Sequence, residues 1–439
     1  MHLPSRSVRT ALVVSVAAAL AAGAPTAGAV TGPRASSPAT AAAVAPAAAP
    51  AAAAAYTYTA ADLRLNRALK SRVTTARFGT AFSGTVLDAG SNTLIWTRGG
   101  STALMPASTT KLVTAHNALT VFGPDARWTT RVRTMPTRGD VVVEATGDPG
   151  LSSAQLDAMA RLTAAWLKEQ GITSSRVWVD DDVFPTPSLA PGWKASYVPD
   201  SIAPVRGLVR DQRGFSDTSL DVGVYFRDRL RARGIPTASY AGRANAAPTS
   251  TTIVLSRGQT VATLVSRMLL GSDNEIAEAL HKLVGIKQGT GASWTGARTA
   301  QSKVLQGQGL ALTALYDGSG LSRSDRLSSV QIARIVDRGI DSRYPKLAPM
   351  RLVAAMPTAG RTGTLAAKYS RFTTSPSKCA AGKVWAKTGR LADVVSLAGF
   401  TRAEDGRVKV FAFVVNGKES TLRLRQDVDM LAATVNGCY

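Results

Sequence analysis

Three short strings of this sequence contain residues that could together carry out acyl transfer at a serine. In chain order they are Ser108-Thr109-Thr110-Lys111, Ser272-Asp273-Asn274 and Lys387-Thr388-Gly389. They supply a hydroxyl nucleophile, an amine that can act as a base, hydroxyl and amide groups near it, and a cation that can hold an anion. Any one string would be weak evidence, because Ser, Thr and Lys are common. All three in this order favour a serine acyl enzyme without a catalytic histidine.

The first string could supply the nucleophile and its base. Ser108 and Lys111 are three residues apart, so a helix would place both side chains on one face. A serine hydroxyl becomes a good nucleophile when a base removes its proton. Lysine can be that base if burial or a nearby positive charge lowers its pKa, and Lys387 could supply such a charge. The alternative is an exposed lysine beside a helix-capping serine.

The second string falls between two helical segments, so we expect it in a short loop. Ser272 could pass a proton between Lys111 and a departing amine. Asn274 could hold Lys111 and donate to the substrate backbone. The alternative is helix capping, for which Ser, Asp and Asn are all favoured, and capping is compatible with catalysis.

The third string ends a predicted strand, where Gly389 would let a ligand lie against the backbone. The cation of Lys387 and the hydroxyl of Thr388 suit a carboxylate. Backbone N–H groups of Ser108 and Arg390 could form an oxyanion hole. The alternative for Lys387 is a lysine that protects a sheet edge from aggregation.

The elements around these strings predict an α+β domain. Strand patterns at both ends of the folded sequence suggest one five-stranded antiparallel sheet with helices on both faces. The predicted strands are 80–88, 93–98, 384–388, 394–401 and 408–415, and helices are expected from Ser108 onward and over 420–435. We therefore assign 60–124 and 251–439 to this domain.

The middle of the chain reads as an insertion. Residues 125–250 contain three short strand candidates and one helix candidate, which predict an inserted mixed α/β subdomain. The strand candidates are 128–134, 140–145 and 176–179, and the helix candidate is 154–170. The separation of the first two strings suggests one inserted subdomain rather than two.

The N-terminal residues predict export. Arg6 and Arg9 precede an apolar stretch at 11–22, and small residues at 27–29 offer a cleavage site, so 1–29 resembles a secretory signal peptide. The apolar stretch is short for a membrane span, although an uncleaved anchor is the alternative. Residues 30–59 are rich in Ala and Pro and predict a disordered linker.

Charge and cysteine content agree with an exported protein. The formal charge of +23 comes from scattered Lys and Arg residues without basic runs. This pattern favours anionic cell-envelope polymers over nucleic acid as the polyanionic partner. The two cysteines, Cys379 and Cys438, permit one disulfide in an oxidising compartment, and two free thiols are the alternative.

The three strings are those of class A β-lactamases and penicillin-binding proteins. Over residues 60–439 the sequence resembles the D-alanyl-D-alanine carboxypeptidase/endopeptidase family of low-molecular-mass penicillin-binding proteins, the class C type with a large insertion between the first two motifs. Further strings carry the resemblance: Gly147-Asp148-Pro149, Asp317-Gly318-Ser319-Gly320-Leu321-Ser322 and Gly363-Thr364-Leu365. The resemblance implies a transpeptidase-like fold, peptidoglycan stem peptides as substrates, β-lactams as acylating inhibitors and no cofactor.

The resemblance also implies roles for the site residues. Ser108, Lys111, Ser272, Asn274 and Lys387 would be catalytic, and Thr388 and Gly389 would bind the substrate. One residue departs from the family pattern, because Arg390 stands where the family usually has Thr or Ser. Its guanidinium could pair with the substrate carboxylate, or it could point away and weaken activity.

Three rival functions share some of these features. A Ser-His-Asp hydrolase is disfavoured, because the two downstream histidines, His116 and His281, suit surface or partly packed positions and no Gly-x-Ser-x-Gly elbow occurs. No metal-binding pattern is present in the sequence. A β-lactamase would need a loop glutamate, and Glu144 and Glu169 lie in the insertion without such a motif. A non-catalytic basic wall-binding protein is the third. Oligomeric state and the balance of carboxypeptidase and endopeptidase activity stay open.

Overall fold

The folded part of the chain begins at Tyr56. The computed structural model describes residues 56–311, 314–351 and 354–439, so the predicted signal peptide and most of the predicted linker lie outside the described residues. The last linker residues do not fit that prediction: the Tyr56 hydroxyl donates to Asp62 at 2.9 Å. Thr59 caps the first helix, α1 (Ala60–Arg72), by accepting from the Asp62 N–H. These contacts tie residues 56–59 to the domain.

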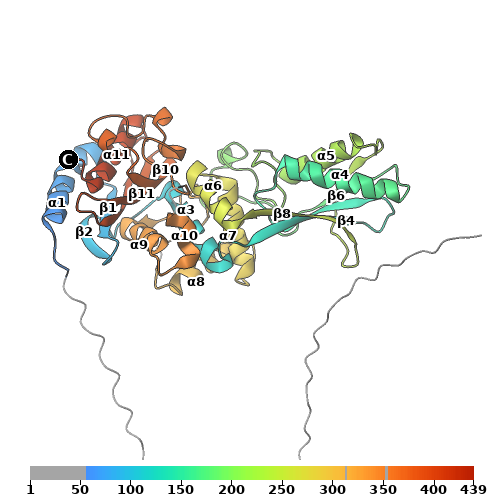
Figure 1. The fold of residues 1–439 in the computed structure, drawn as a ribbon, viewed down its shortest axis with the longest axis horizontal. Helices are drawn as coiled ribbons and strands as arrows, with labels where there is room; N and C mark the ends of the chain where they lie inside the picture. The colour runs from blue at the N-terminus through green and yellow to red at the C-terminus, as the bar shows by residue number, and fades with distance from the viewer. Residues whose placement is uncertain (1–55, 312–313, 352–353) are drawn as a thin grey trace, which may run out of the picture. The chain divides into compact units, whose positions relative to one another are not determined.

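The main sheet has five strands in the order β10-β11-β12-β1-β2, with every neighbouring pair antiparallel. β1 pairs along its whole length with β12, from Phe82 opposite Val415 to Asp88 opposite Lys409. Figure 1 shows these first and last parts of the chain side by side. The predicted sheet is confirmed. Its strands are β1 (Phe82–Asp88), β2 (Thr93–Arg98), β10 (Val384–Leu391), β11 (Val394–Arg402) and β12 (Val408–Asn416).

The strand that carries the third string is longer than predicted. β10 continues to Leu391 and turns directly into β11. Thr388 and Gly389 are paired with Leu397 and Ser396 of β11. The third string therefore lies inside a strand rather than at its end, because the hairpin with β11 extends the pairing.

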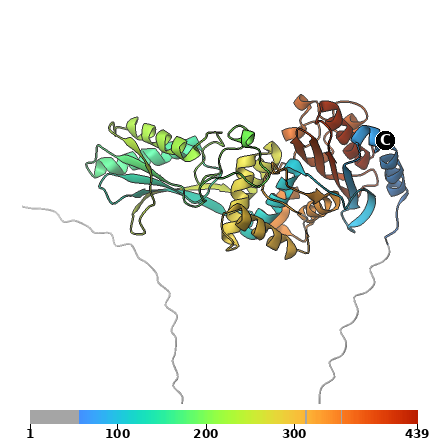
Figure 2. The same ribbon diagram turned by 180° about the vertical axis from the view of Figure 1, so that it is seen from behind.

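Helices cover both faces of this sheet, as predicted. Val410, Ala412 and Val414 of β12 pack on one side against a core that includes α3 (Lys111–Phe122) and α9 (Ser329–Ile340). The intervening Phe411 and Phe413 face the opposite core, which includes α1 and α11 (Leu422–Asn436). Figure 2 shows the blue N-terminal and red C-terminal segments together on that side. A strand buried on both faces reads as a continuous apolar run.

The insertion contains a second five-stranded sheet in the order β7-β6-β5-β4-β8, with parallel and antiparallel pairs. Two helices pack on it around a core that includes Leu156, Val177 and Phe226. The strands are β4 (Arg127–Thr134), β5 (Val141–Ala145), β6 (Arg176–Asp180), β7 (Ser239–Arg243) and β8 (Thr252–Thr260), and the helices are α4 (Ser153–Glu169) and α5 (Thr218–Arg231). The predicted β4, β5, β6 and α4 are all present.

Three elements of the insertion were not predicted, namely α5, β7 and β8. β8 pairs with β4 from Thr252 to Thr260, so the second sheet extends beyond residue 250, where we placed the end of the insertion. β8 lacks a clear alternation of buried and exposed residues, which is why its sequence gave a weak strand signal. The division into two domains otherwise stays a prediction.

All the remaining helices except α2 lie between β8 and β10 in chain order. α6 and α7 are separated only by Ser272 and Asp273, so the predicted loop is confirmed for these two residues, whereas Asn274 is the first residue of α7. None of the helices in the described ranges is long and apolar enough to cross a membrane. The other helices and short strands are α2 (Thr75–Phe78), β3 (Ala103–Leu104), α6 (Val261–Gly271), α7 (Asn274–Lys287), α8 (Trp294–Gln306), β9 (Leu327–Ser328) and α10 (Ala348–Arg351).

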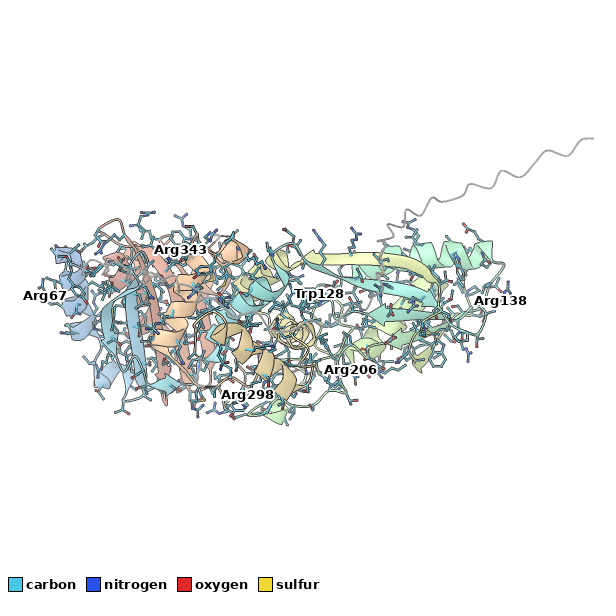
Figure 3. All side chains as sticks on the ribbon, turned by 90° about the horizontal axis from the view of Figure 1, so that it is seen from below. Arg67, Trp128, Arg138, Arg206, Arg298 and Arg343 are labelled. Carbon is cyan, nitrogen blue, oxygen red and sulfur yellow. A yellow bond between two sulfur atoms is a disulfide. The ribbon has the colours of Figure 1, made fainter. Side chains whose placement is uncertain are left out.

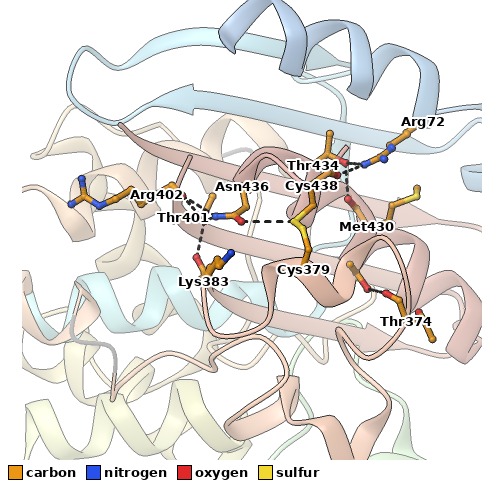
Figure 4. Close-up of a disulfide and its surroundings, with 11 residues drawn as sticks. Arg72, Thr374, Cys379, Lys383, Thr401, Arg402, Met430, Thr434, Asn436 and Cys438 are labelled. Carbon is orange, nitrogen blue, oxygen red and sulfur yellow. Dashed lines mark hydrogen bonds between the residues drawn. A yellow bond between two sulfur atoms is a disulfide. The ribbon is translucent and has the colours of Figure 1, made fainter. Parts of the chain in front are cut away.

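The predicted disulfide is present. Cys379, in the segment before β10, is linked to Cys438, just after α11 (Figure 4). Arg72 of α1 donates to the Cys438 carbonyl at 2.8 Å. The C-terminus is therefore held against both α1 and the segment that leads into the third string.

Positive charge is spread over many elements. Arg67, Arg138 and Arg343 are exposed and come from distant parts of the fold (Figure 3). The charge is uneven between the two parts of the chain, because residues 125–260 contain 17 Lys and Arg against 14 Asp and Glu. Most of the excess of +23 therefore belongs to the rest of the chain.

We expect the buried Lys409 of β12 to be important for stability. Its ammonium donates to Asp62 at 2.7 Å and to Asp88 at 3.0 Å. Lys409→Met would leave the buried Asp62 carboxylate with Arg407 as its remaining cation. Because a buried carboxylate that loses one of its two cations is costly, we expect a loss of about 2 kcal/mol in the free energy of unfolding by urea. Lys70→Met, at an exposed position of α1, is the control and should change it by less than about 0.5 kcal/mol.

The same substitution should change the acid dependence of stability. The ion pairs of Asp62 with Lys409 and Arg407 lower the pKa of Asp62 in the folded protein. The Asp62 carboxylate therefore stabilises the fold at pH values above its unfolded pKa. This stability is lost as the pH falls towards the pKa of Asp62 in the folded protein. The native protein should therefore lose stability below about pH 4, and Lys409→Met should lose less over the same range. Parallel curves for the two proteins would contradict this account.

Candidate active site

A tight turn fixes Ser108 at the start of α3. The turn is a 3-10 segment, Ala107–Thr110, and Lys111 is the first residue of the helix. Ala107 is buried with a φ of +48°, a conformation that non-glycine residues rarely adopt. Gly320 packs against it so closely that a Cβ on Gly320 would lie 2.0 Å from the Ala107 carbonyl oxygen. The surrounding structure thus holds the turn in a sparsely populated conformation.

The ammonium of Lys111 is completely buried and has three oxygen partners. Its Nζ donates to the Ser108 Oγ at 3.1 Å, to the Asn274 Oδ1 at 2.7 Å and to the Ser319 carbonyl at 2.7 Å. The structure therefore brings the first two strings together around one nitrogen atom. The string that begins at Asp317 supplies the third partner.

Burial lowers the pKa of Lys111 to about 8, and the nearby acids Glu278 and Asp317 oppose that shift. Of the two causes we considered, burial and a positive charge from Lys387, burial is the main one. Lys387 is itself fully buried, and burial followed by the charge of Lys111 lowers its pKa. A base near neutral pH is the form of lysine that can accept a serine proton.

Ser272 lies beside the third string. It ends α6 in the left-handed conformation, with φ of 62° and ψ of 37°. Its Oγ accepts a hydrogen bond from Lys387 Nζ at 2.9 Å, and Lys387 also donates to the Thr388 carbonyl at 2.7 Å. Among the described residues Ser272 has no hydrogen bond to Lys111. A direct transfer between Lys111 and Ser272 in the free protein, which we considered, is therefore not supported.

Two buried acids support the Lys111 site, and sequence reasoning assigned no role to either one. Glu278 of α7 accepts from the N–H groups of Gly318 and Ser319 at 2.9 and 2.8 Å. Asp317 accepts from the Gly320 N–H at 2.8 Å. These bonds orient the Ser319 carbonyl towards Lys111. For Asp317 the sequence contained a signal, because this residue begins one of the strings that carry the family resemblance. For Glu278 the only signal was its position on an apolar helix face.

Part of the insertion supports the same loops. Asn274 Nδ2 donates to the Ser201 carbonyl at 2.7 Å. Trp193 Nε1 donates to Asp317 at 2.7 Å, and Ser322 Oγ donates to the Pro191 carbonyl at 2.6 Å. The insertion is thus connected to the residues that hold Lys111, a role that the sequence analysis did not assign to it.

A cavity of about 240 Å³ brings the remaining site residues together with Ser108. Gly389 borders it, and a Cβ there would lie 2.8 Å from the Pro106 carbonyl oxygen and 3.1 Å from the Ser108 nitrogen. Only glycine allows β10 to approach the Ser108 turn so closely. The cavity is lined by Ser108, Ser272, Thr364, Tyr369, Arg371, Thr388, Gly389, Arg390, Val395, Ser396 and Arg425.

The groups next to the third string suit an anion. The hydroxyls of Thr388 and Thr364 are 2.7 Å apart. Arg390 is exposed, lines the cavity and donates through Nε to the Ser420 Oγ at 3.1 Å. Its two terminal nitrogens are left for a ligand. Guanidinium and hydroxyl donors of this kind bind carboxylates well.

Both downstream histidines are buried, which corrects our expectation of surface or partly packed positions. His116 of α3 and His281 of α7 are 0% and 3% exposed. Burial lowers their pKa values to about 4 and about 3. Neither lines the cavity around Ser108. They belong to the helix packing, because α3 and α7 are buried along most of their length.

Comparisons with known proteins agree with this geometry. A family model described as D-Ala-D-Ala carboxypeptidase 3 (S13) family matches residues 65–213 and 198–435. The chain is 32% identical over 384 residues to carboxypeptidase DacB of Mycolicibacterium smegmatis, covering 81% of this chain and 80% of that protein. It is 30% identical over 379 residues to carboxypeptidase Rv3627c of Mycobacterium tuberculosis, with the same coverage of 81% and 80%.

A solved structure supports the fold. Penicillin binding protein 4 (dacB) of Haemophilus influenzae superposes with a TM-score of 0.69 at 19% identity, covering 82% of this chain and 98% of that one. This confirms the predicted transpeptidase-like fold. The family match and the two mycobacterial relatives confirm the resemblance drawn from the motifs. The chain therefore belongs to the D-Ala-D-Ala carboxypeptidase 3 (S13) family of serine peptidases.

Proposed function

We propose that the protein hydrolyses peptidoglycan stem peptides ending in D-Ala-D-Ala through an acyl enzyme on Ser108, and that β-lactams acylate the same serine. The observation that carries this proposal is the buried Lys111 Nζ, 3.1 Å from the Ser108 Oγ. Burial lowers the pKa of that amine to about 8. A neutral amine at this distance can accept the serine proton as the oxygen attacks.

In the first step Ser108 Oγ bonds to the carbonyl carbon of the penultimate D-Ala, and Lys111 takes its proton. The oxyanion that forms would accept from the N–H groups of Ser108 and Arg390. The close approach of β10 to the Ser108 nitrogen at Gly389 supports this arrangement.

In the second step the bond to the terminal D-Ala breaks, and its nitrogen needs a proton. Ser272 would deliver its hydroxyl proton to the leaving nitrogen and, in the substrate complex, take in its place the proton that Lys111 removed from Ser108, while Lys387 donates to the Ser272 Oγ and holds it in place. Lys111, neutral again, takes a proton from the water that attacks the ester on Ser108 and passes it to the serine oxygen as the shortened peptide leaves. Asn274 keeps Lys111 in place throughout.

The terminal carboxylate would be held by Lys387, Thr388 and Arg390. The hydroxyl pair of Thr388 and Thr364 and the free end of Arg390 support this placement. Cleavage of a D-Ala cross-link would use the same groups, so endopeptidase activity belongs to the same proposal. We also propose export, with anionic cell-envelope polymers as partners of the basic surface.

A β-lactamase and a non-catalytic wall-binding protein are the alternatives, and one experiment separates them. Intact mass after mixing with benzylpenicillin should show one covalent adduct per native chain. Ser108→Ala should show none, and Ser101→Ala, at an exposed position nearby, should react like the native protein. Turnover of the antibiotic without a lasting adduct would indicate a β-lactamase. No reaction at all would contradict the acyl enzyme.

The acylation rate should follow the titration of Lys111. Since the base must be neutral and its pKa is lowered to about 8, the second-order rate constant should rise about tenfold per pH unit below that value and level off above it. Measuring penicillin acylation by mass spectrometry from pH 6 to 9.5 tests this expectation. A rate that stays constant across the range would exclude Lys111 as the base.

Arg390→Gln should weaken recognition of the free carboxylate. Loss of a charge-assisted hydrogen bond should lower the ratio of kcat/KM for a D-Ala-D-Ala acid over its C-terminal amide by about tenfold. Arg402→Gln is the control, since Arg402 is exposed on β11 and does not line the cavity. If Arg390→Gln leaves the ratio unchanged, Arg390 points away from the substrate.

A further inference from the structure

Three guanidinium groups line the cavity that contains Ser108, namely those of Arg371, Arg390 and Arg425. Only Arg371 has a carboxylate partner. It donates to both oxygens of Asp429, at 2.8 and 2.5 Å, and both side chains are buried. That ion pair accounts for one of the three charges.

The other two charges have no acidic partner. Arg390 donates to Ser420 and Arg425 donates to the Thr421 carbonyl of its own helix. Within the described ranges, no carboxylate oxygen lies within 4.0 Å of a guanidinium nitrogen of either. The rest of the sequence, residues 1–55, 312–313 and 352–353, contains no Asp or Glu. Asp429, whose charge raises the pKa of Arg425, is already paired with Arg371. Among the described residues, neither Arg390 nor Arg425 therefore has an ion-pair partner of its own.

The two guanidinium groups also repel each other. Burial, and then the charges of Arg390 and Arg371, lower the pKa of Arg425. Two like charges beside one small cavity are unfavourable unless an anion lies between them. Such an arrangement is common where a protein binds an anionic ligand.

Arg425 lines the part of the cavity where the leaving residue of the substrate would lie. Thr388 and Arg390 are two residues apart on β10, so both side chains lie on one face of the strand. Under the proposed function the terminal carboxylate lies beside Thr388, and the leaving residue therefore borders Arg390. One carboxylate would be satisfied by Lys387, Thr388 and Arg390. Arg425 of α11, on the same cavity, remains without a counter-charge.

We propose that Arg425, together with Arg390, forms a second anion subsite that selects a leaving residue with an acidic side chain. The preferred substrate is then a peptide whose terminal residue is a D-dicarboxylic amino acid, with one carboxylate at Thr388 and the other at Arg425. This inference rests on the proposed function, because it places the leaving residue by reference to the acyl enzyme on Ser108.

The test compares two peptides that differ only in this charge, one ending in D-Ala-D-Glu and the other in the uncharged isostere D-Ala-D-Gln. For the native protein we expect kcat/KM to be about tenfold higher for D-Glu, the effect of one charge-assisted hydrogen bond. Arg425→Gln should bring the ratio close to one, and Arg425→Lys, which keeps the charge, should retain part of it.

Arg423→Gln is the matched control. Arg423 lies on the same helix, has a side chain that is 80% exposed, and is paired with Asp427. It does not line the cavity, so its variant should keep the native ratio. In the native protein the ratio should also fall as NaCl rises from about 0.05 to about 0.5 M, because salt screens the interaction; this arm is independent of how the variants fold.

Two results would overturn the subsite. One is a native ratio of one or less for D-Glu over D-Gln, and the other is an unchanged ratio in a folded Arg425→Gln. Failure of the proposed function looks different, because native protein would then form no benzylpenicillin adduct and hydrolyse neither peptide. A native protein that forms the adduct and hydrolyses both peptides equally would refute the subsite alone.

Discussion

The fold of the site depends on burying the ammonium of Lys111. A charge removed from water is costly unless several oxygens surround it, and here they come from three separate elements: the Ser108 turn, Asn274 of α7 and the Ser319 carbonyl. Segments more than 160 positions apart must therefore meet at one nitrogen. The buried Glu278 fixes the Ser319 peptide in turn. Two of the three motifs therefore meet at this nitrogen, whereas the third, Lys387-Thr388-Gly389, joins the site through the hydrogen bond from Lys387 to Ser272.

The burial of Lys111 also sets the chemistry. Burial favours the neutral amine, whereas the negative field of Glu278 and Asp317 favours the ammonium. Glu278 opposes burial only weakly, because burial and the charge of Asp317 raise the pKa of Glu278 to about 8. Burial therefore prevails, and the pKa of Lys111 falls to about 8 rather than staying near its ordinary value. A lysine in this balance can release and regain a proton near neutral pH, which a solvated lysine cannot do.

The sequence predicted the main sheet because its strands follow clear patterns, with β12 apolar on both faces and turns at Asp405 and Gly406. The sequence did not predict elements whose conformation depends on tertiary contacts. α5 contains Gly223, a poor helix former, and a Cβ there would lie 2.4 Å from the Tyr240 ring. Packing against the second sheet therefore selects that glycine. The role of Glu278 could not be predicted either, because its hydrogen-bond partners lie 40 positions away in a loop without regular structure.

Arginines that stabilise the fold differ from arginines that could bind a ligand in whether they have an acidic partner. In the insertion many arginines are matched by nearby aspartates, as Arg243 is by Asp181 and Asp217. In such ion pairs the two charges neutralise each other, so the arginine attracts an anionic ligand only weakly. Beside Ser108 the arrangement is reversed, because Arg390 and Arg425 have no acid among their contacts. Two like charges side by side repel each other and lower stability. The repulsion between Arg390 and Arg425 beside Ser108 is explained if the substrate brings the missing negative charge. Arg390, the residue that departs from the family pattern, would then help to determine which substrate is bound.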